Sequence, residues 1–241
     1  MADPFSDLMI AIDLKDLAAA QAALDAGADI DGVFGKTRRL SPDTRYFYSG
    51  TTPLAHAVRV GGLELIDWVA SKGADLEAPV HGSDPSILVA VARQSAAPRK
   101  ITRLLELGAD PNAISSDHKT ALHYACSAGK LASVRALLGA GARVDVGLCD
   151  PNYGVDELPT YTPLYECCVS RQLECALALL DAGANPNTGR SDSWLMSPLG
   201  MAIKQEDRRL IEALLEHGAR TDPNLLAPRL EAEMRTILAL P

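Results

Sequence analysis

The chain has 241 residues, of which 47% are hydrophobic, and its 31 Asp and Glu residues against 23 Lys and Arg residues give a formal net charge of −8. This length suits one extended domain or two compact ones, and the hydrophobic content is sufficient for a packed core. The acidic balance argues against nucleic acid or an anionic membrane as the main partner, because both require a basic footprint.

The cysteines and the N-terminal residues bear on the compartment. The five cysteines form no Cys-x-x-Cys pair, so we interpret them as small buried hydrophobic residues in a reducing compartment and expect no metal site. The N-terminal stretch is acidic where a signal peptide is basic, and no apolar run of membrane-spanning length follows. We therefore expect a cytoplasmic, soluble protein without a cofactor.

An internal repeat runs along the whole chain. Six times a Leu-rich or Ala-rich segment ends in Gly-Ala, at Gly27, Gly73, Gly108, Gly141, Gly183 and Gly218. Upstream of four of these lies a second signal, which reads TPLAHA from Thr52, TALHYA from Thr120, TPLYEC from Thr162 and SPLGMA from Ser197. The separation between the second signal and the glycine is the same in all four, and the pair Ser6 and Gly27 repeats it.

Each part of the repeat has a physical reading. Thr or Ser at the first position can cap the N-terminus of a helix, and Pro in the next position loses no helical hydrogen bond. The glycine supplies the left-handed residue that ends a second helix. One helix pair cannot bury its own apolar face, so the pairs must stack on one another.

This pattern resembles the ankyrin repeat, which carries Thr-Pro-Leu-His-x-Ala, two helices and a Gly-Ala-Asp turn. The segment from Thr120 to Asp145 is an almost complete match. The resemblance implies an all-α ankyrin-repeat solenoid that forms a single domain over residues 1–241. The six repeats are expected at residues 6–31, 52–77, 85–112, 120–145, 162–187 and 197–222, and the amphipathic residues 223–241 are expected to form a capping helix. The third repeat lacks the Thr-Pro signal and carries Pro98 between its helices.

Two connections between repeats are too long, at residues 32–51 and 146–161. In ankyrin-repeat proteins such a connection is a hairpin-like finger that projects toward the binding face, so we expect two extended fingers. The first carries four cations against the single acid Asp43, while the second is acidic. The consecutive aromatics of the first finger, Tyr46, Phe47 and Tyr48, either fold back onto the helices or point outward. If the stretch is a strand, its side chains alternate, so at least one faces outward.

Short stretches that resemble catalytic or ligand-binding motifs do not have the residue spacing that those motifs require. The GKT at residues 35–37 lacks the upstream glycine, strand and following helix of a phosphate-binding loop. The DAGADIDG stretch does not fit a calcium loop, because Gly27 would take the first ligand position. His123 belongs to the repeat signal, where the family implies a structural imidazole. Because no nucleophile elbow, zinc motif or carboxylate pair is present, we predict no catalysis.

The expected function is therefore binding of another protein by the concave face and the long aromatic and basic finger. The predicted contact residues are Arg38, Arg39, Tyr46, Phe47, Tyr48, His56, Tyr124, Tyr153, Glu166, Trp194 and Met201. Aromatic anchors in an acidic background suit a partner with a basic patch and an apolar pocket. We expect a monomer. An adaptor, an inhibitor or immunity-type protein that neutralises a basic enzyme or toxin, a host-directed bacterial effector and self-assembly through the finger all stay open.

Overall fold

The computed structural model describes residues 3–35, 38–44, 46–78, 80, 86–94, 97–147, 161–189, 197–220 and 236, with the backbone alone at residues 38, 39, 46 and 47. The chain divides into two compact units, Met1–Asp117 and His118–Pro241. Every helix found in the described residues belongs to a pair of antiparallel neighbours that stacks on the next pair of its unit, so the predicted all-α repeat architecture is confirmed.

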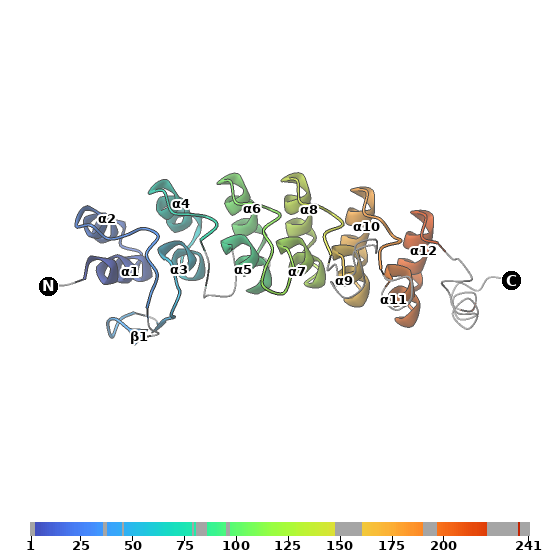
Figure 1. Ribbon diagram of the computed structural model, residues 1–241, viewed down its shortest axis with the longest axis horizontal. Coiled ribbons are helices and arrows are strands. Elements are labelled where there is room, and N and C mark those ends of the chain that lie inside the picture. Colours follow the sequence, from blue (N-terminus) through green and yellow to red (C-terminus); the bar gives the residue numbers. More distant parts are fainter. Residues whose placement is uncertain are drawn as a thin grey trace. The chain divides into compact units, whose positions relative to one another are not determined.

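The first unit contains three helix pairs. Its helices are α1 (Pro4–Leu14), α2 (Leu17–Asp25), α3 (Pro53–Val60), α4 (Leu63–Ser71), α5 (Ile87–Gln94) and α6 (Pro98–Glu106). The first helices of the pairs, α1, α3 and α5, form one row, and α2, α4 and α6 form a second row (Figure 1). Between α2 and α3 the chain makes a two-stranded antiparallel ribbon of β1 (Arg38–Arg39) and β2 (Tyr46–Phe47).

The second unit repeats the arrangement. Its helices are α7 (Ala121–Ser127), α8 (Leu131–Gly139), α9 (Pro163–Val169), α10 (Leu173–Asp181), α11 (Pro198–Lys204) and α12 (Arg208–Glu216). The helices α7, α9 and α11 pack in one row and α8, α10 and α12 in the other (Figure 1).

Side-chain caps start the first helices where the sequence predicts them. The Thr52 hydroxyl accepts the Ala55 amide at 3.2 Å, the Thr162 hydroxyl accepts the Tyr165 amide at 3.3 Å, and the Ser197 hydroxyl accepts the Gly200 amide at 3.0 Å. Thr120 and His123 form a capping box in which Nδ1 of the buried His123 accepts the Thr120 amide at 3.1 Å. His123 therefore has the structural role expected for it. Each such cap contributes about 1 kcal/mol to helix stability.

The third repeat has one side-chain cap that the sequence analysis did not predict. Ser86 stands in the place of the missing threonine, and its hydroxyl accepts the Val89 amide at 3.5 Å. The sequence analysis expected Pro98 between the two helices, but Pro98 is the first residue of α6. The first turn of a helix tolerates proline because the amide there has no partner within the helix.

One buried leucine per repeat forms the centre of each first-helix row, and these are Leu8, Leu54, Leu88, Leu122, Leu164 and Leu199. Full burial of a leucine contributes roughly 1.5–3 kcal/mol. The second helices add Ile66, Leu104, Leu137, Leu179 and Leu214 from their inner faces. The small residues Ala57, Ala125 and Ala202 beside them let the helices approach closely.

A ladder of side-chain acceptors joins successive turns within each unit. Asp31 accepts the amide of Asp75 at 2.8 Å, and Glu77 accepts that of Asp110 at 2.9 Å. In the second unit Asp145 accepts the amide of Asn185 at 3.0 Å, and Asn187 that of Arg220 at 2.7 Å. Each turn is thus hydrogen-bonded to a neighbouring turn of its unit, although the turn itself contains only a few polar residues.

Two sequence expectations about organisation stay predictions. The capping helix at 223–241 lies outside the described residues except for Thr236. The single continuous domain also stays a prediction, because the two compact units are described separately.

Candidate functional site

The long finger is anchored to the first repeat by its own aromatic residue. Phe34 is only 3% exposed and packs against the buried Met9 of α1, with Phe5 and Leu40 partly buried on the same cluster. The ring centroids of Phe5 and Phe34 are 5.8 Å apart. Figure 1 shows the ribbon on the side of α1 and α3 that faces away from α2 and α4. The apolar part of the finger is therefore held on the first-helix row.

Backbone hydrogen bonds close the base of the finger. The Phe34 amide donates to the Thr51 carbonyl at 3.1 Å, and the Gly50 amide donates to the Phe34 carbonyl at 2.7 Å. Further out, Arg38 pairs with Phe47 and Arg39 with Tyr46 across the ribbon. At the tip the buried Thr44 hydroxyl donates to the Ser41 carbonyl at 2.9 Å. The finger is a hairpin with a defined register.

Tyr48 is an exposed aromatic residue of the finger. Its side chain is 47% exposed, and Cζ of Arg59 on α3 lies 5.5 Å from the centroid of its ring. This is the range of a cation–π interaction, which is worth about 0.5–1 kcal/mol at an exposed site. The contact joins the C-terminal end of the finger to the first-helix row, so Tyr48 and Arg59 form one continuous surface.

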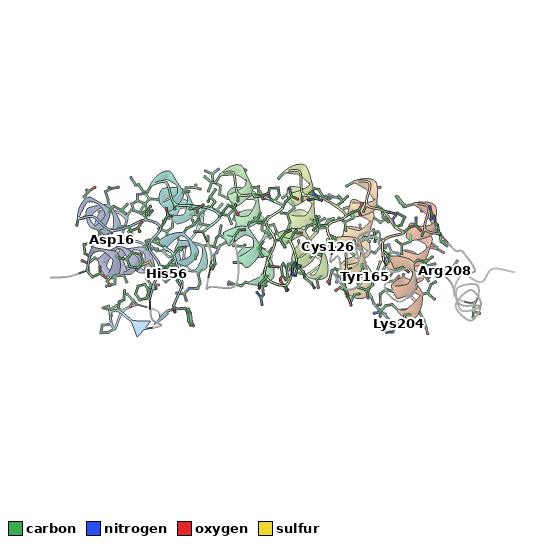
Figure 2. All side chains as sticks on the ribbon, viewed as in Figure 1. Asp16, His56, Cys126, Tyr165, Lys204 and Arg208 are labelled. Carbon is green, nitrogen blue, oxygen red and sulfur yellow. The ribbon has the colours of Figure 1, made fainter. Side chains whose placement is uncertain are left out.

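His56 is a residue of α3 (Figure 2). Its ring is fully buried, with Nε2 at 2.9 Å from Oδ1 of Asp13 on α1 and Nδ1 at 2.9 Å from Nη2 of Arg59. A guanidinium can only donate, so Nδ1 accepts, and Nε2 carries the proton and donates to Asp13. The direct contact of His56 with a partner stays a prediction. The ring offers no exposed surface but holds Arg59 and ties α3 to α1.

A small apolar pocket opens next to Arg59, between α3 and α5. Its walls are Ala55 and Val58 of α3, Ile87, Ala90 and Val91 of α5, and Val80, and its polar members are Arg59 and Gln94. The alanines in the walls leave the space that larger side chains would fill. Nearby, Nζ of Lys100 donates to the Val58 carbonyl, and partial burial lowers the pKa of this ammonium below its ordinary value.

In the second unit the predicted contact residues lie on the first-helix row. Tyr124 of α7 is half-buried, while Glu166 of α9 is 8% exposed and pairs through Oε1 with Nζ of Lys119 at 2.6 Å. Met201 of α11 is largely buried, and its sulfur lies 3.9 Å from Nε2 of Gln205. A larger fraction of the Tyr124 side chain is therefore exposed than of Glu166, whose carboxylate is engaged in an ion pair with Lys119.

Other predicted contact residues fall outside what is described. The side chains of Arg38, Arg39, Tyr46 and Phe47 are not described, and neither Tyr153 nor Trp194 is among the described residues. Of the second finger only Val146, Gly147 and Tyr161 are described. The Tyr161 ring meets that of Tyr165 edge-on at 5.4 Å, and burial raises the pKa of Tyr165. These contact predictions stay predictions.

The sequence analysis did not include Arg59 and Arg93 among the candidate contact residues. Arg59 follows His56 by one helical turn, and Arg93 occupies the equivalent place on the next first helix, α5. The signal was present, since residues a turn apart share a helix face. Asp13 could not be found in this way, because its partner His56 is distant in sequence.

The four described cysteines are buried thiols. A hydrogen bond with Cys126, together with burial, raises the pKa of Cys167 far above its ordinary value, and burial raises the pKa of Cys175 to about 11. A buried, protonated thiol is a poor nucleophile. Among the described residues no group of three His, Cys, Asp or Glu side chains could hold a metal ion. Within the same part of the chain no helix has the length and apolar character needed to span a membrane.

Comparison with known proteins agrees with the geometry. A family model described as ankyrin repeats (3 copies) matches residues 87–190. The transient receptor potential channel pyrexia of Drosophila melanogaster is 31% identical over 180 residues, which are 74% of this chain and 17% of the channel. Ankyrin repeat and SOCS box protein 11 of Danio rerio is 38% identical over 104 residues, which are 43% of this chain and 31% of that protein. The chain thus spans less than a third of the length of either relative.

A solved structure covers more of the chain. The crystal structure of an ankyrin repeat domain from Acinetobacter baumannii AYE superposes with a TM-score of 0.70 and 25% sequence identity, over 88% of this chain and 98% of that one. The ankyrin repeat fold is typically a protein–protein interaction module and generally not catalytic. With its capped helix pairs, glycine turns and finger in the expected places, the chain is an ankyrin-repeat protein.

Proposed function

We propose that this chain is a non-catalytic module that binds a partner protein through its long finger and the first-helix face. The observation that carries the proposal is Tyr48, a half-exposed aromatic held in place by Arg59 and by the closed base of the finger. Tyr and Arg are enriched among the residues that dominate binding energy. A preformed hairpin also loses little conformational entropy when it docks.

The proposed contact residues lie on the finger and first helices of the first unit and, separately, in the second unit. Arg38, Arg39, Tyr46 and Phe47 would contribute from the ribbon, and Tyr124 from the second unit. Tyr153, Trp194, Glu166 and Met201 are secondary candidates, and His56 supports the surface from behind. The partner would offer an apolar pocket to the displayed aromatics and a basic patch to the acidic parts of the chain, whose net charge is −8.

The test is capture of partners from a lysate of the source cells. The intact chain is compared with a variant in which Tyr46, Phe47 and Tyr48 are changed to Ala, and with Leu17→Ala as the control. Leu17 is exposed on α2, away from the finger. We expect one protein to be retained by the intact chain and by Leu17→Ala and lost by the triple variant, at equal melting temperatures. Capture that survives the triple variant would place the interface elsewhere.

The same experiment separates the biological roles left open by the sequence. Loss of enzymatic activity in the captured protein on binding would favour an inhibitor or immunity-type protein. Two proteins captured through separable surfaces would favour an adaptor, and a host protein would favour an effector.

A further inference from the structure

We infer that a proton and Arg59 compete for the Nδ1 lone pair of His56, so that mildly acidic conditions release Arg59 from the buried ring and loosen the contact between Tyr48 of the finger and α3. The inference adds a response to pH, which the proposed function does not include. Its test observes the ring and the guanidinium themselves, so its outcome is separate from whether a partner protein binds.

The competition follows from the hydrogen bonds of the ring. Nδ1 of His56 lies 2.9 Å from Nη2 of Arg59, which can only donate, so the Nδ1 lone pair accepts this bond. Nε2 already carries the proton that it donates to Asp13 at 2.9 Å. A second proton can therefore bind only at Nδ1, and it turns this acceptor into a donor. The proton or the Arg59 bond occupies the lone pair, but never both, whatever further contacts Arg59 makes.

The charges on the two sides of the ring explain which group leaves. While the ring is neutral, the Asp13 carboxylate on one side is balanced by the Arg59 guanidinium on the other. After protonation the imidazolium and Asp13 form an ion pair, and the guanidinium becomes a second cation beside the ring. Because the His56 side chain is fully buried and that of Asp13 is 3% exposed, water screens this repulsion poorly. Arg59 is half-buried, so it is the member of the three that can move toward water.

The other charged and titratable groups near α3 leave the competition in place. The elements packed against α3 are α1, α4 and α5, and Arg59 also meets the finger. Their groups are Asp7 and Asp13 of α1, Glu64 and Asp67 of α4, Arg93 of α5, and Asp43 and Tyr48 of the finger, in addition to four finger cations whose side chains are not described. Asp67 pairs with Arg103, and Asp7, Asp43, Glu64 and Arg93 are exposed. Asp13, which favours the imidazolium, and Arg59, which opposes it, act on the ring directly.

Arg59 transmits the change to the finger. Its Cζ lies 5.5 Å from the centroid of the Tyr48 ring, and the bond to His56 is one of the contacts that hold the guanidinium there. When the ring takes up a proton, that bond is lost and the guanidinium moves away from Tyr48. Imidazole ordinarily changes its charge between about pH 5 and about pH 8, so the response is sought in that interval.

Nuclear magnetic resonance of the full chain tests the inference. With ¹⁵N in histidine and arginine, the shifts of the His56 ring nitrogens report its protonation, and the Hε signal of Arg59 reports its position over the Tyr48 ring. Between about pH 8 and about pH 5 we expect both signals to change with a shared midpoint. His56→Gln is the matched variant, because its amide can accept from Arg59 and donate to Asp13 but does not titrate. In this variant the Arg59 signal should stay constant.

Reciprocity supplies a second measurement. If Arg59 competes with the proton, its removal must strengthen proton binding by the ring. We expect Arg59→Met, which keeps an unbranched apolar stem, to raise the affinity of His56 for its proton at least about tenfold. Arg209→Met changes an exposed arginine of the second unit and should leave that affinity within about twofold. Melting curves check that each variant is folded.

Three results would each overturn the inference. They are a ring that stays neutral at every pH at which the chain is folded, a ring that gains its proton with no change at Arg59, and an unchanged proton affinity in Arg59→Met. An Arg59 signal that moves equally in His56→Gln would also overturn it, because another group would then drive the response.

Discussion

Arg59 donates from Nη2 to Nδ1 of His56 across 2.9 Å, and this bond decides which nitrogen of the buried ring carries its proton. The other nitrogen then donates to Asp13, also at 2.9 Å. Arg59, a side chain of the proposed binding surface, is in this way linked through one ring to the first helix of the preceding repeat. The surface and the stacking of two repeats therefore depend on the same three side chains.

Replacing His56 should cost stability. His56→Ala leaves the nearly buried Asp13 carboxylate without its ring partner and opens a cavity beside Arg59. We expect the free energy of unfolding to fall by about 2–4 kcal/mol. Urea denaturation measures it. The control His217→Ala removes an exposed histidine from the end of α12 and should change stability by less than about 0.5 kcal/mol. Equal effects of the two changes would show that the buried network contributes nothing.

Phe34 should control the order of the finger. Phe34→Ala removes the ring that packs on Met9 and Phe5, and a buried Phe→Ala change costs about 3–5 kcal/mol where the site cannot collapse. The helices do not need this ring, so the loss should concentrate in the finger. Hydrogen exchange at the ribbon amides of residues 38–47 should accelerate, while that of α9 and α10 stays the same. Tyr48→Ala is the matched control, because it removes a displayed aromatic and should leave these amides protected.

Glu77 should make stability fall as pH rises. Burial raises the pKa of Glu77 above its ordinary value of 4.5, with Asp110 and Asp75 adding repulsion. The folded chain therefore binds this proton more tightly than the unfolded chain does, so stability is lost as pH rises through the range just above 4.5. Glu77→Gln keeps an acceptor for the Asp110 amide and removes the charge. Urea denaturation from about pH 4 to about pH 7 should show a smaller decline for Glu77→Gln than for the intact chain. Glu174→Gln, at an exposed site on α10, should follow the intact chain.

The described cysteines should react with alkylating agents only after unfolding. Cys126, Cys167 and Cys168 are fully buried and Cys175 nearly so, and the pKa is raised for the last three. Because the thiolate is the reactive form, labelling by iodoacetamide near pH 8 should be slower by at least about a hundredfold in the folded chain than in urea. Peptide mass spectrometry gives the rate at each site. Rapid labelling of Cys167 in the native chain would contradict the packing of α7 against α9.

Asn187 tests the ladder that joins the turns. It accepts the Arg220 amide and donates from Nδ2 to the Gly218 carbonyl at 3.0 Å. Asn187→Ala loses both bonds and should lower the free energy of unfolding by about 1–2 kcal/mol. Asn187→Asp retains the acceptor and should lose less, since only the bond to Gly218 is removed. Thermal denaturation compares the two, and equal losses would show that the acceptor bond is not the stabilising one.

The sequence was enough to predict the repeat and its caps. Thr52, Thr162 and Ser197 cap their helices through local bonds, and Gly141 and Gly183 adopt φ of 85° and 88°, which glycine alone adopts without strain. These features depend on residues within a few positions of each other, so the one-dimensional pattern contains them. The same holds for the exposure of at least one of three consecutive aromatics, which Tyr48 satisfies.

The parts of the surface that depend on distant neighbours were decided by tertiary structure. The burial of Phe34 against Met9, the bond between His56 and Asp13, and the pocket between α3 and α5 each join segments that are separate in sequence. The sequence pattern around a histidine in the first helix is the same whether its ring faces a groove or a carboxylate. The helical period determines the direction of the side chain but not which residues it contacts. The repeat could therefore be predicted from the sequence. The stacking of the repeats determined which side chains are exposed and which are buried behind them.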